Sequence, residues 1–397
     1  MFSSGGPSVR FLTNNGLSSL FNMAFGLPYW VIIVVMAVLT GIYVIVGGYM
    51  ATAINDFIQG IIMLIGIIAV VAAVVMNQGG LTAAEAKLAA IKVPGGFDGA
   101  LSSFLGPDPM ALLFVVILTS LGTWGLPQMV NKFYAIKSEK DIHKGTVIST
   151  IFAIIVAGGC YFLGGFGRLF GDKVPKQPDG TTPLFDQIIP NMLSDLAPVL
   201  IAIVIVLVLS ASMSTLSSLV LTSSSTFTLD LIQPTMKKKM SENRKVLIMR
   251  IFIVFFILVS AMIAIVKDAN PTVTFIAQMM GVSWGALAGA FLAPFLYGLY
   301  WKKTTKIASI VCFFWGCGIA VFQLVVSLAK IDVTAWGPVL GFLFKSSINS
   351  GVLAMVGGLI IVPVVSLFTK KPNQEQTDKL FDAYEEKREV PAKEALD

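Results

Sequence analysis

The chain has 397 residues, of which 56% are hydrophobic and only 13% are charged. A soluble domain of ordinary composition carries about 25% charged residues, so this composition excludes a typical soluble protein. The formal net charge of +6 comes from short clusters between apolar segments, which indicates membrane orientation and argues against a nucleic-acid partner. The single histidine, His143, lies in a lysine-rich segment, and the three cysteines lie in apolar segments. Neither pattern suits a metal centre or a catalytic relay, so we expect no enzymatic activity.

The apolar residues fall in about nine blocks, each long enough to cross a bilayer as a helix. The blocks cover residues 28–48, 55–77, 109–131, 146–167, 197–230, 247–266, 272–300, 307–329 and 350–369. The pattern predicts an all-α membrane protein with about nine transmembrane helices. Its expected parts are an extracytoplasmic segment over 1–27, a transmembrane domain over 28–369 and a tail over 370–397.

The basic residues set the orientation of these spans. Lysine and arginine cluster in alternate connections, over residues 132–144, 237–245 and 302–306, and again at 370–371. The positive-inside rule makes these connections and the C-terminus cytoplasmic, and we expect the cytoplasmic membrane as the location. Counting back places residues 1–27 outside, although they carry one charge and do not resemble a signal peptide. We therefore expect further membrane helices to precede this segment, which would make the chain a truncated form.

Asp56 is the acidic residue that lies within an apolar block, directly after Asn55. An aspartate near a helix N-terminus is stabilised by free main-chain amides and by the helix dipole. A carboxylate inside a membrane span can also belong to an ion path. The sequence leaves both interpretations open.

The span over 109–131 contains Gly122, Gly125 and Pro127. Proline removes a main-chain donor and crowds the carbonyl four residues before it, so an unwound or sharply kinked segment is predicted. Broken membrane helices expose main-chain groups that transporters use to bind solutes. A kink that serves only helix packing is the alternative.

The span over 197–230 is longer than the roughly 20 residues that a bilayer needs, and so is the span over 272–300. Such helices must tilt, protrude or break. The first of them is rich in hydroxyl side chains, and Ala211, Ser214 and Thr215 share one face at helical spacing. A carbonyl and two hydroxyls are neutral oxygen ligands that suit a weakly held monovalent cation. Close helix packing, with the hydroxyls bonded to the preceding turn, is the alternative.

In the polar tail, Leu380, Phe381 and Tyr384 stand at helical spacing. This pattern predicts a partly helical tail, with a disordered tail as the alternative.

Four segments in chain order resemble the sodium:solute symporter family, with the proline and pantothenate symporter branch as the nearest match. They are 47–59 (GGYMATAINDFIQ), 125–133 (GLPQMVNKF), 210–218 (SASMSTLSS, followed by Ser223, Ser224 and TLD at 228–230) and 294–302 (PFLYGLYWK). The resemblance covers about 28–369. It implies a partial LeuT-type inverted-repeat transporter fold of five plus five helices with flanking helices. The first two spans would end the first repeat, and the next five would form the second. The family's first core helix, which supplies further sodium ligands, has no counterpart in the sequence.

The resemblance also implies roles for individual residues. Sodium would be bound by the carbonyl of Ala211 and the hydroxyls of Ser214 and Thr215, while Asp56 would assist sodium passage. Thr119, Thr123, Trp124 and Gln128 would lie at or near the solute cavity. Thr123 stands where sugar- and proline-carrying members often have an aromatic residue, so neither solute is assigned.

The expected function is sodium-coupled symport of a small organic solute, such as an amino acid or a carboxylate, by alternating access. Na⁺ is the expected coupling ion, and the lipid bilayer and the solute are the expected partners. The alternative is a non-transporting fragment of such a symporter or of a transporter-like sensor. The sequence makes no prediction of the oligomeric state.

Overall fold

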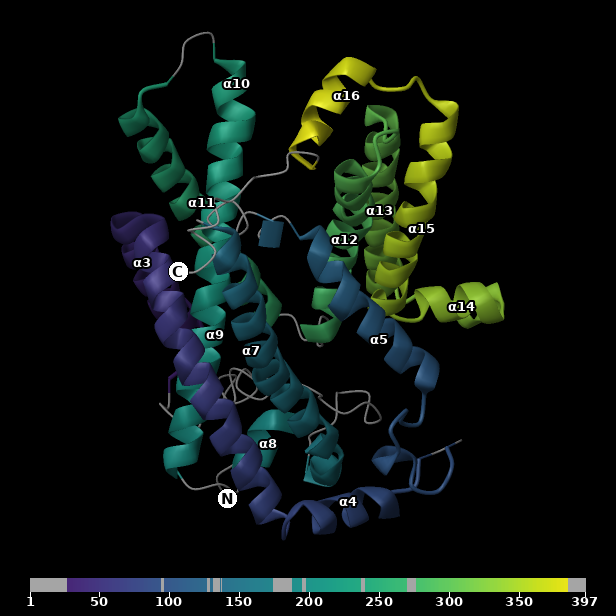
Figure 1. Ribbon diagram of the computed structural model, residues 1–397. Coiled ribbons are helices and arrows are strands. Elements are labelled where there is room, and N and C mark those ends of the chain that lie inside the picture. The colour runs from purple at the N-terminus through teal and green to yellow at the C-terminus, as the bar shows by residue number, and fades with distance from the viewer. Residues whose placement is uncertain are drawn as a thin grey trace, which may run out of the picture. The chain divides into compact units, whose positions relative to one another are not determined.

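A computed structural model describes the chain over most of its length. The described residues are 27–93, 96–126, 129–130, 136, 138–173, 188–194, 198–236, 240–269 and 276–384. All regular secondary structure in these ranges is helical, which confirms the predicted all-α class (Figure 1). Internal contacts divide the chain into two compact units. The first comprises Met1–Pro107 and Tyr134–Phe275, and the second comprises Asp108–Phe133 and Ile276–Asp397.

Seven helices in the described part of the chain are long and apolar enough to cross a membrane. They are Trp30–Asn77, Lys140–Gly171, Val199–Thr235, Glu242–Val266, Gly281–Tyr300, Lys306–Leu328 and Ser347–Phe368. The first of these contains two predicted spans, 28–48 and 55–77. The predicted span 109–131 corresponds to a shorter apolar helix, Pro109–Gly125. The count of nine spans therefore stays a prediction.

The helix α3 (Tyr29–Asn77) reverses its direction at Gly48, whose φ of 58° and ψ of −153° lie outside helical geometry. In the first half, Ile32 packs against Ile205 of α9 (Pro198–Ser225). In the second half, a Cβ placed on Gly66 would lie 2.9 Å from Leu207 of the same helix. Because residues 32 and 66 meet the same turn of α9, α3 forms two antiparallel passes.

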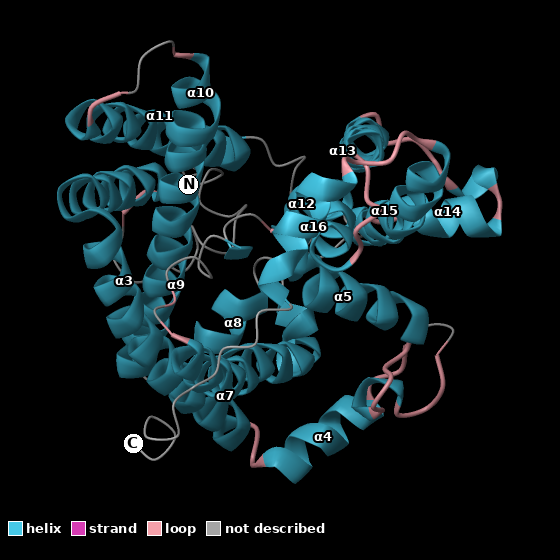
Figure 2. Cartoon of the chain, turned by 45° about the horizontal axis from the view of Figure 1, so that its top comes forward, coloured by secondary structure: helices cyan, strands magenta, loops and turns pink. Residues whose placement is uncertain are grey.

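The rest of the first unit packs around α3 and α9. Its other helices are α4 (Leu81–Ala90), η1 (Ala100–Ser102), α7 (Glu139–Gly165), η3 (Phe166–Lys173), α8 (Ile188–Ser194) and α11 (Glu242–Ala269). The helices α7 and α11 both lie beside α3, and α11 also contacts α9 (Figures 1 and 2). The side chain of Ser138 caps α7 by accepting a hydrogen bond from the amide of Asp141. The cap stabilises the start of α7, and its apolar body is long enough to cross a bilayer.

The overlong span over 197–230 changes its winding near its end. The helix α9 stops at Ser225 and continues as a π-helix, η5 (Thr226–Ile232), and then as the short α10 (Gln233–Thr235). The side chain of Thr228 in the π-helix is fully buried. A π-helical turn is rare and marks a local functional or packing constraint. Of the predicted outcomes for an overlong span (tilt, protrusion or a break), the structure shows a local change of winding, from α-helix to π-helix, at the C-terminal end.

The second unit is built around a tightly packed group of three long helices. Its elements are α5 (Pro109–Leu121), η2 (Gly122–Gly125), α12 (Ile276–Tyr300), α13 (Lys306–Leu328), η6 (Thr334–Trp336), α14 (Pro338–Phe344) and α15 (Ser347–Phe368). Small residues let α12 and α15 approach closely, since a Cβ placed on Gly285 would lie 2.6 Å from Gly351 Cα. Such backbone approach replaces the hydrophobic effect as a source of association between membrane helices.

The tail begins with α16 (Gln374–Phe381), followed by η7 (Asp382–Tyr384). The predicted helical spacing of Leu380, Phe381 and Tyr384 is therefore confirmed. Residues 385–397 lie outside the described residues.

Candidate functional site

The three predicted sodium ligands lie on α9 in the first unit. Ala211 and Ser214 are half-buried, and Thr215 is exposed. The hydroxyl of Thr215 donates a hydrogen bond to the carbonyl of Ala211 across 2.9 Å. This bond brings two oxygens of the predicted set together on one face, and it is also the bond to the preceding turn that the helix-packing alternative predicts.

The other serines of α9 have a different role. Ser210, Ser217 and Ser224 follow one another at seven-residue spacing and are buried. The hydroxyls of Ser217 and Ser224 donate to carbonyls three residues earlier, at 2.9 and 3.0 Å. These hydroxyls are satisfied by their own helix, as helix packing requires. The serine-rich sequence thus combines a buried packing face with the more open face of Ala211, Ser214 and Thr215.

Asp56 lies in the second half of α3, two turns after the reversal at Gly48. The first turn after the reversal is closed locally, since the hydroxyl of Thr52 donates to the carbonyl of Gly48 at 2.8 Å. An aspartate this far into a helix cannot accept from the free amides at its start. The capping interpretation of Asp56 is therefore wrong. The carboxylate is half-buried, and one of its oxygens is shielded from solvent.

A group of polar side chains that the sequence analysis missed surrounds Asp56. The hydroxyl of Tyr43 donates to the carbonyl of Met213 on α9 at 3.2 Å. The same phenol interacts with the side chains of Ser217, Thr40 and Asn55, and the charge of Asp56 acts on it. The signal was present in the sequence, because Thr40 and Tyr43 stand at i, i+3 in an apolar block. Asn55 and Gln59 likewise stand at i, i+4.

Several atoms of this polar group are buried without a hydrogen-bond partner among the described residues. They are Thr40 Oγ1, Asn55 Nδ2 and Gln59 Oε1. A buried polar atom without a partner is costly, so this cluster is a candidate for binding water or an ion. Its position beside Met213 places it one residue from the predicted ligand Ser214. The arrangement can offer oxygen atoms to a cation that moves along this part of the first unit.

The predicted break in the span 109–131 is present in the second unit. The carboxylate of Asp108 caps α5 by accepting from the amide of Ala111 at 3.0 Å. The α-helix ends at Leu121, tightens into the 3₁₀ helix η2, and gives way to extended backbone at Leu126. The break therefore begins at Gly122, as the glycine and proline pattern predicts. Pro127 itself lies outside the described residues.

The break needs a glycine at position 125, because the backbone of η2 lies very close to α12 there. A Cβ placed on Gly125 would lie 2.8 Å from the main-chain nitrogen of Leu292 in α12. At Gly122 the nearest atom, the Cβ of Ala288, would be 3.5 Å away, which is ordinary van der Waals contact. Gly125 thus allows η2 to lie directly against the backbone of α12.

The predicted solute residues gather around the same break. Thr119 and Thr123 are half-buried, and their hydroxyls donate to the carbonyls of Val115 at 2.8 Å and Ser120 at 3.0 Å. Trp124 is 59% exposed. Gln128 lies outside the described residues. The two threonines share one helix face, and an exposed indole stands one residue beyond them.

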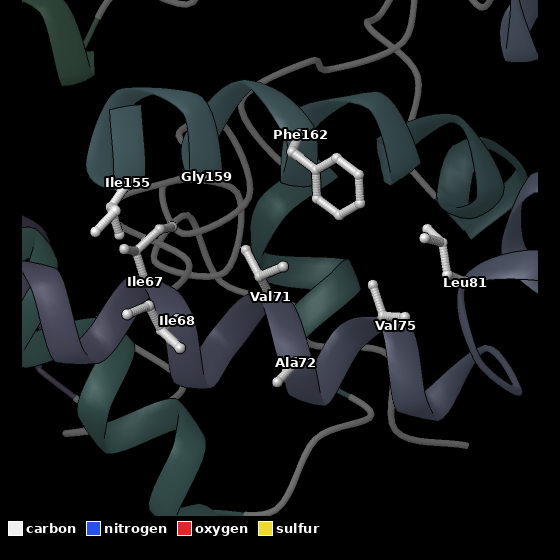
Figure 3. A pocket seen from close by; sticks show the side chains of 9 residues that line it. All are labelled: Ile67, Ile68, Val71, Ala72, Val75, Leu81, Ile155, Gly159 and Phe162. Carbon is white, nitrogen blue, oxygen red and sulfur yellow. The ribbon is translucent and has the colours of Figure 1, made fainter. Parts of the chain in front are cut away.

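A groove of about 400 Å³ runs between the second half of α3 and α7 (Figure 3). Val71 and Val75 of α3 and Phe162 of α7 point into it. All nine lining residues are apolar. A wall without hydrogen-bonding side chains cannot select a polar solute. The candidate sites are therefore those on α9 and on α5–η2.

Comparison with protein families gives one match. Residues 15–316 match the family model described as "Sodium:solute symporter family". The match contains the predicted sodium residues, Asp56 and the four predicted solute residues.

Curated relatives show the same kinship. An osmoregulated proline transporter of Bacillus subtilis is 26% identical over 91% of this chain and 68% of its own length. A sodium/pantothenate symporter of Haemophilus influenzae is 28% identical over 78% of this chain and 61% of its own length. A sodium/proline symporter of Staphylococcus aureus is 29% identical over 94% of this chain and 70% of its own length. The chain thus aligns with about two thirds of each relative.

Among solved structures, a Na⁺-coupled sialic acid symporter in a substrate-bound, outward-open state is similar, with a TM-score of 0.61. The sequence identity is 16%, and the match covers 92% of this chain and 73% of the other. At this identity the similarity concerns the fold alone. It agrees with the transporter fold expected from the four sequence segments.

Proposed function

This chain belongs to the sodium:solute symporter family, a family of sodium-coupled transporters rather than enzymes. We propose which of its residues bind sodium and which contact the solute. Ala211, Ser214 and Thr215 on α9 bind sodium. Thr119, Thr123, Trp124 and Gln128, at the broken end of α5, contact the solute. The solute and sodium cross the cytoplasmic membrane together by alternating access.

The family match over residues 15–316, which includes Ala211, Ser214 and Thr215, supports the sodium assignment, and Thr215 Oγ1 and Ala211 O lie 2.9 Å apart on one face of α9. A sodium ion can take both oxygens as ligands when the hydroxyl, which keeps its proton, turns its O–H away from the carbonyl. Neutral oxygens hold a monovalent cation weakly enough to release it, which a transport cycle needs. A pair of carboxylates would favour a divalent cation instead.

Asp56 assists sodium on its way to or from α9. The charge of its carboxylate acts on Tyr43, which donates a hydrogen bond to the carbonyl of Met213, the residue that precedes Ser214. A negative charge inside a membrane span lowers the energy of a passing cation. The membrane potential adds about 2.3 kcal/mol per transported charge for each 100 mV, so sodium entry drives solute uptake.

The solute class follows from the break in α5 and from the relatives. Broken membrane helices leave main-chain groups free for binding a small polar solute near the membrane midplane. The named relatives carry proline or pantothenate, and both molecules contain a carboxylate. We assign this chain a small organic solute of that kind, an amino acid or a carboxylate, without choosing between the two.

The orientation completes the proposal. The lysines after α12 and after α15 lie on one side of the second unit, because the hydroxyls of Thr305 and Thr369 are 2.7 Å apart. The positive-inside rule assigns that side to the cytoplasm. The C-terminal tail is then cytoplasmic.

Uptake into proteoliposomes tests the proposed function. The purified chain is reconstituted, and radiolabelled proline, pantothenate and other small carboxylates are offered with an inward sodium gradient. We expect accumulation of at least one of them, and its loss when potassium replaces sodium or an ionophore collapses the gradient. Equal uptake with and without the sodium gradient would contradict the proposal.

A further inference from the structure

Five lysines gather at one end of the second unit. Lys302, Lys303 and Lys306 lie in and after the connection between α12 and α13, and Lys370 and Lys371 follow α15. All five are exposed, and we refer to them as the lysine surface. Two hydrogen bonds hold the two chain segments together at this point. The hydroxyls of Thr305 and Thr369 are 2.7 Å apart, and the amide of Thr305 donates to Ser366 Oγ at 3.2 Å.

An apolar rim lies directly beside the lysine surface. Tyr300 is 73% exposed, Leu367 is 69% exposed and Phe368 is 86% exposed. These residues end α12 and α15, two or three positions before the first lysine of each segment. Exposed aromatic and aliphatic side chains followed at once by lysines are typical of the boundary between acyl chains and headgroups. The lysines therefore stand at the level of the lipid headgroups.

One carboxylate of the chain itself forms an ion pair with the lysine surface. Asp378 of α16 accepts a charged hydrogen bond from Lys302 at 3.0 Å, and the Phe381 ring lies 5.5 Å from the same ammonium. The other acid that α16 pairs, Glu375, is bonded to Lys379 of its own helix at 3.3 Å. The tail thus supplies one carboxylate, which pairs with Lys302. The five lysines of the surface carry five positive charges, so the surface keeps a net positive charge beside this one negative charge.

We propose that the lysine surface binds the headgroups of anionic phospholipids, with the apolar rim in contact with their acyl chains. Four or more lysines directly beside a membrane helix attract an anionic lipid surface, and each strengthens binding by roughly fivefold. The paired threonines fix the two lysine-bearing segments side by side, so that a phosphate can meet lysines from both. This inference does not depend on the solute or on the sodium ligands.

Native mass spectrometry of the purified chain in detergent tests the proposal. Phosphatidylglycerol and phosphatidylcholine are titrated separately, and the bound lipids are counted. The variant Lys303→Gln/Lys306→Gln/Lys370→Gln removes three charges from the lysine surface. The variant Lys92→Gln/Lys330→Gln/Lys345→Gln is the matched control, because it removes three exposed lysines that do not belong to the lysine surface: Lys330 after α13, Lys345 before α15, and Lys92 in the first unit.

We expect the unmodified chain and the control variant to prefer phosphatidylglycerol. The lysine-surface variant should bind it roughly tenfold or more weakly, with unchanged binding of phosphatidylcholine. Equal preference in both variants would overturn the proposal, and so would the absence of any preference in the unmodified chain.

Two further measurements on the unmodified chain do not depend on whether the variants fold. Raising the salt concentration should reduce the preference, since ions screen exposed charges. A preference that is insensitive to salt would contradict a headgroup interaction. Glycerol phosphate should compete only weakly, because it lacks acyl chains for the apolar rim. Binding of glycerol phosphate as tight as that of the lipid would assign the surface to a soluble phosphate and overturn the lipid proposal.

Discussion

The hydroxyl of Tyr43 and the main-chain carbonyl of Met213 lie 3.2 Å apart, and their hydrogen bond joins the first half of α3 to α9. The bond connects the polar group around Asp56 with the helix that carries the predicted sodium ligands. Met213 directly precedes Ser214, so a displacement of Tyr43 would also shift the face of α9 that carries the predicted sodium ligands. Asp56 and α9 belong to the same unit of the structure.

Replacing Tyr43 by phenylalanine should lower the free energy of unfolding by about 0.5–1.5 kcal/mol, the usual net effect of one lost hydrogen bond. Thermal unfolding in detergent measures this. Tyr49→Phe is the control, because Tyr49 lies on the same helix and is 58% exposed. Equal effects of the two substitutions would show that the bond to Met213 contributes nothing.

Replacing Gly48 by alanine should destabilise the hairpin in α3. The φ of 58° and ψ of −153° belong to a region that is almost restricted to glycine, and another residue there costs about 1–3 kcal/mol. Gly158→Ala is the control, since a Cβ at Gly158 meets no atom within 4 Å and the residue lies within α7. That change should be neutral or stabilising, by up to about 1 kcal/mol. Unfolding temperatures in detergent compare the two. If Gly48→Ala were as stable as the unmodified chain, the reversal at this residue would be refuted.

Replacing Gly125 by alanine should disturb the broken end of α5. The new methyl group would lie 2.8 Å from the backbone of Leu292, which cannot move as a side chain can, so we expect a loss of about 1–3 kcal/mol. Gly122→Ala serves as the comparison, because its Cβ would lie 3.5 Å from the nearest atom, the Cβ of Ala288. Unfolding temperature and solute uptake are the two measurements. An equal loss of stability and of uptake in both variants would contradict this explanation.

Replacing Asp378 by asparagine should loosen α16 from the second unit. The pair with Lys302 is about half exposed, so its contribution is only about 0.2–1 kcal/mol. Hydrogen exchange over residues 374–381 should accelerate by a few-fold. Glu375→Gln breaks the pair with Lys379 within α16 and should not release the helix from Lys302. Unchanged exchange in Asp378→Asn would mean that other contacts hold the tail.

The sequence pattern predicts the parts of this fold that depend on local composition. Runs of apolar residues gave the spans, and two glycines followed by a proline indicated the break in the span 109–131. The spacing of Leu380, Phe381 and Tyr384 indicated the tail helix. Each of these features is encoded within a few turns of one segment.

The features that the sequence did not reveal depend on contacts between distant segments. The polar group around Tyr43 forms because α3 reverses and brings residues 40–43 and 55–59 to the same stretch of α9. The π-helix after Ser225 likewise packs against a distant segment, since Phe227 lies against Phe252 and Phe256 of α11. Local propensity cannot predict either arrangement, since the partners are far apart in the chain. The capping interpretation of Asp56, one of the two that the sequence left open, fails because it requires a helix that begins beside Asn55, whereas the helix begins directly after Gly48.

The most direct test of the sodium assignment is the stabilisation of the chain by sodium, which needs no knowledge of the solute. Unfolding temperatures are compared in sodium chloride and in potassium chloride at equal ionic strength, since an ion that binds only the folded state raises stability. Thr146→Val is the matched control for Thr215→Val, because the hydroxyl of Thr146 makes the same bond to the carbonyl four residues earlier, at 2.8 Å, on an exposed face of α7. We expect sodium to stabilise the unmodified chain and Thr146→Val and to have little effect on Thr215→Val. At a sodium concentration of about 100 times the Kd, the stabilisation should be about 2.7 kcal/mol. Full sodium stabilisation of Thr215→Val would contradict the sodium site on α9.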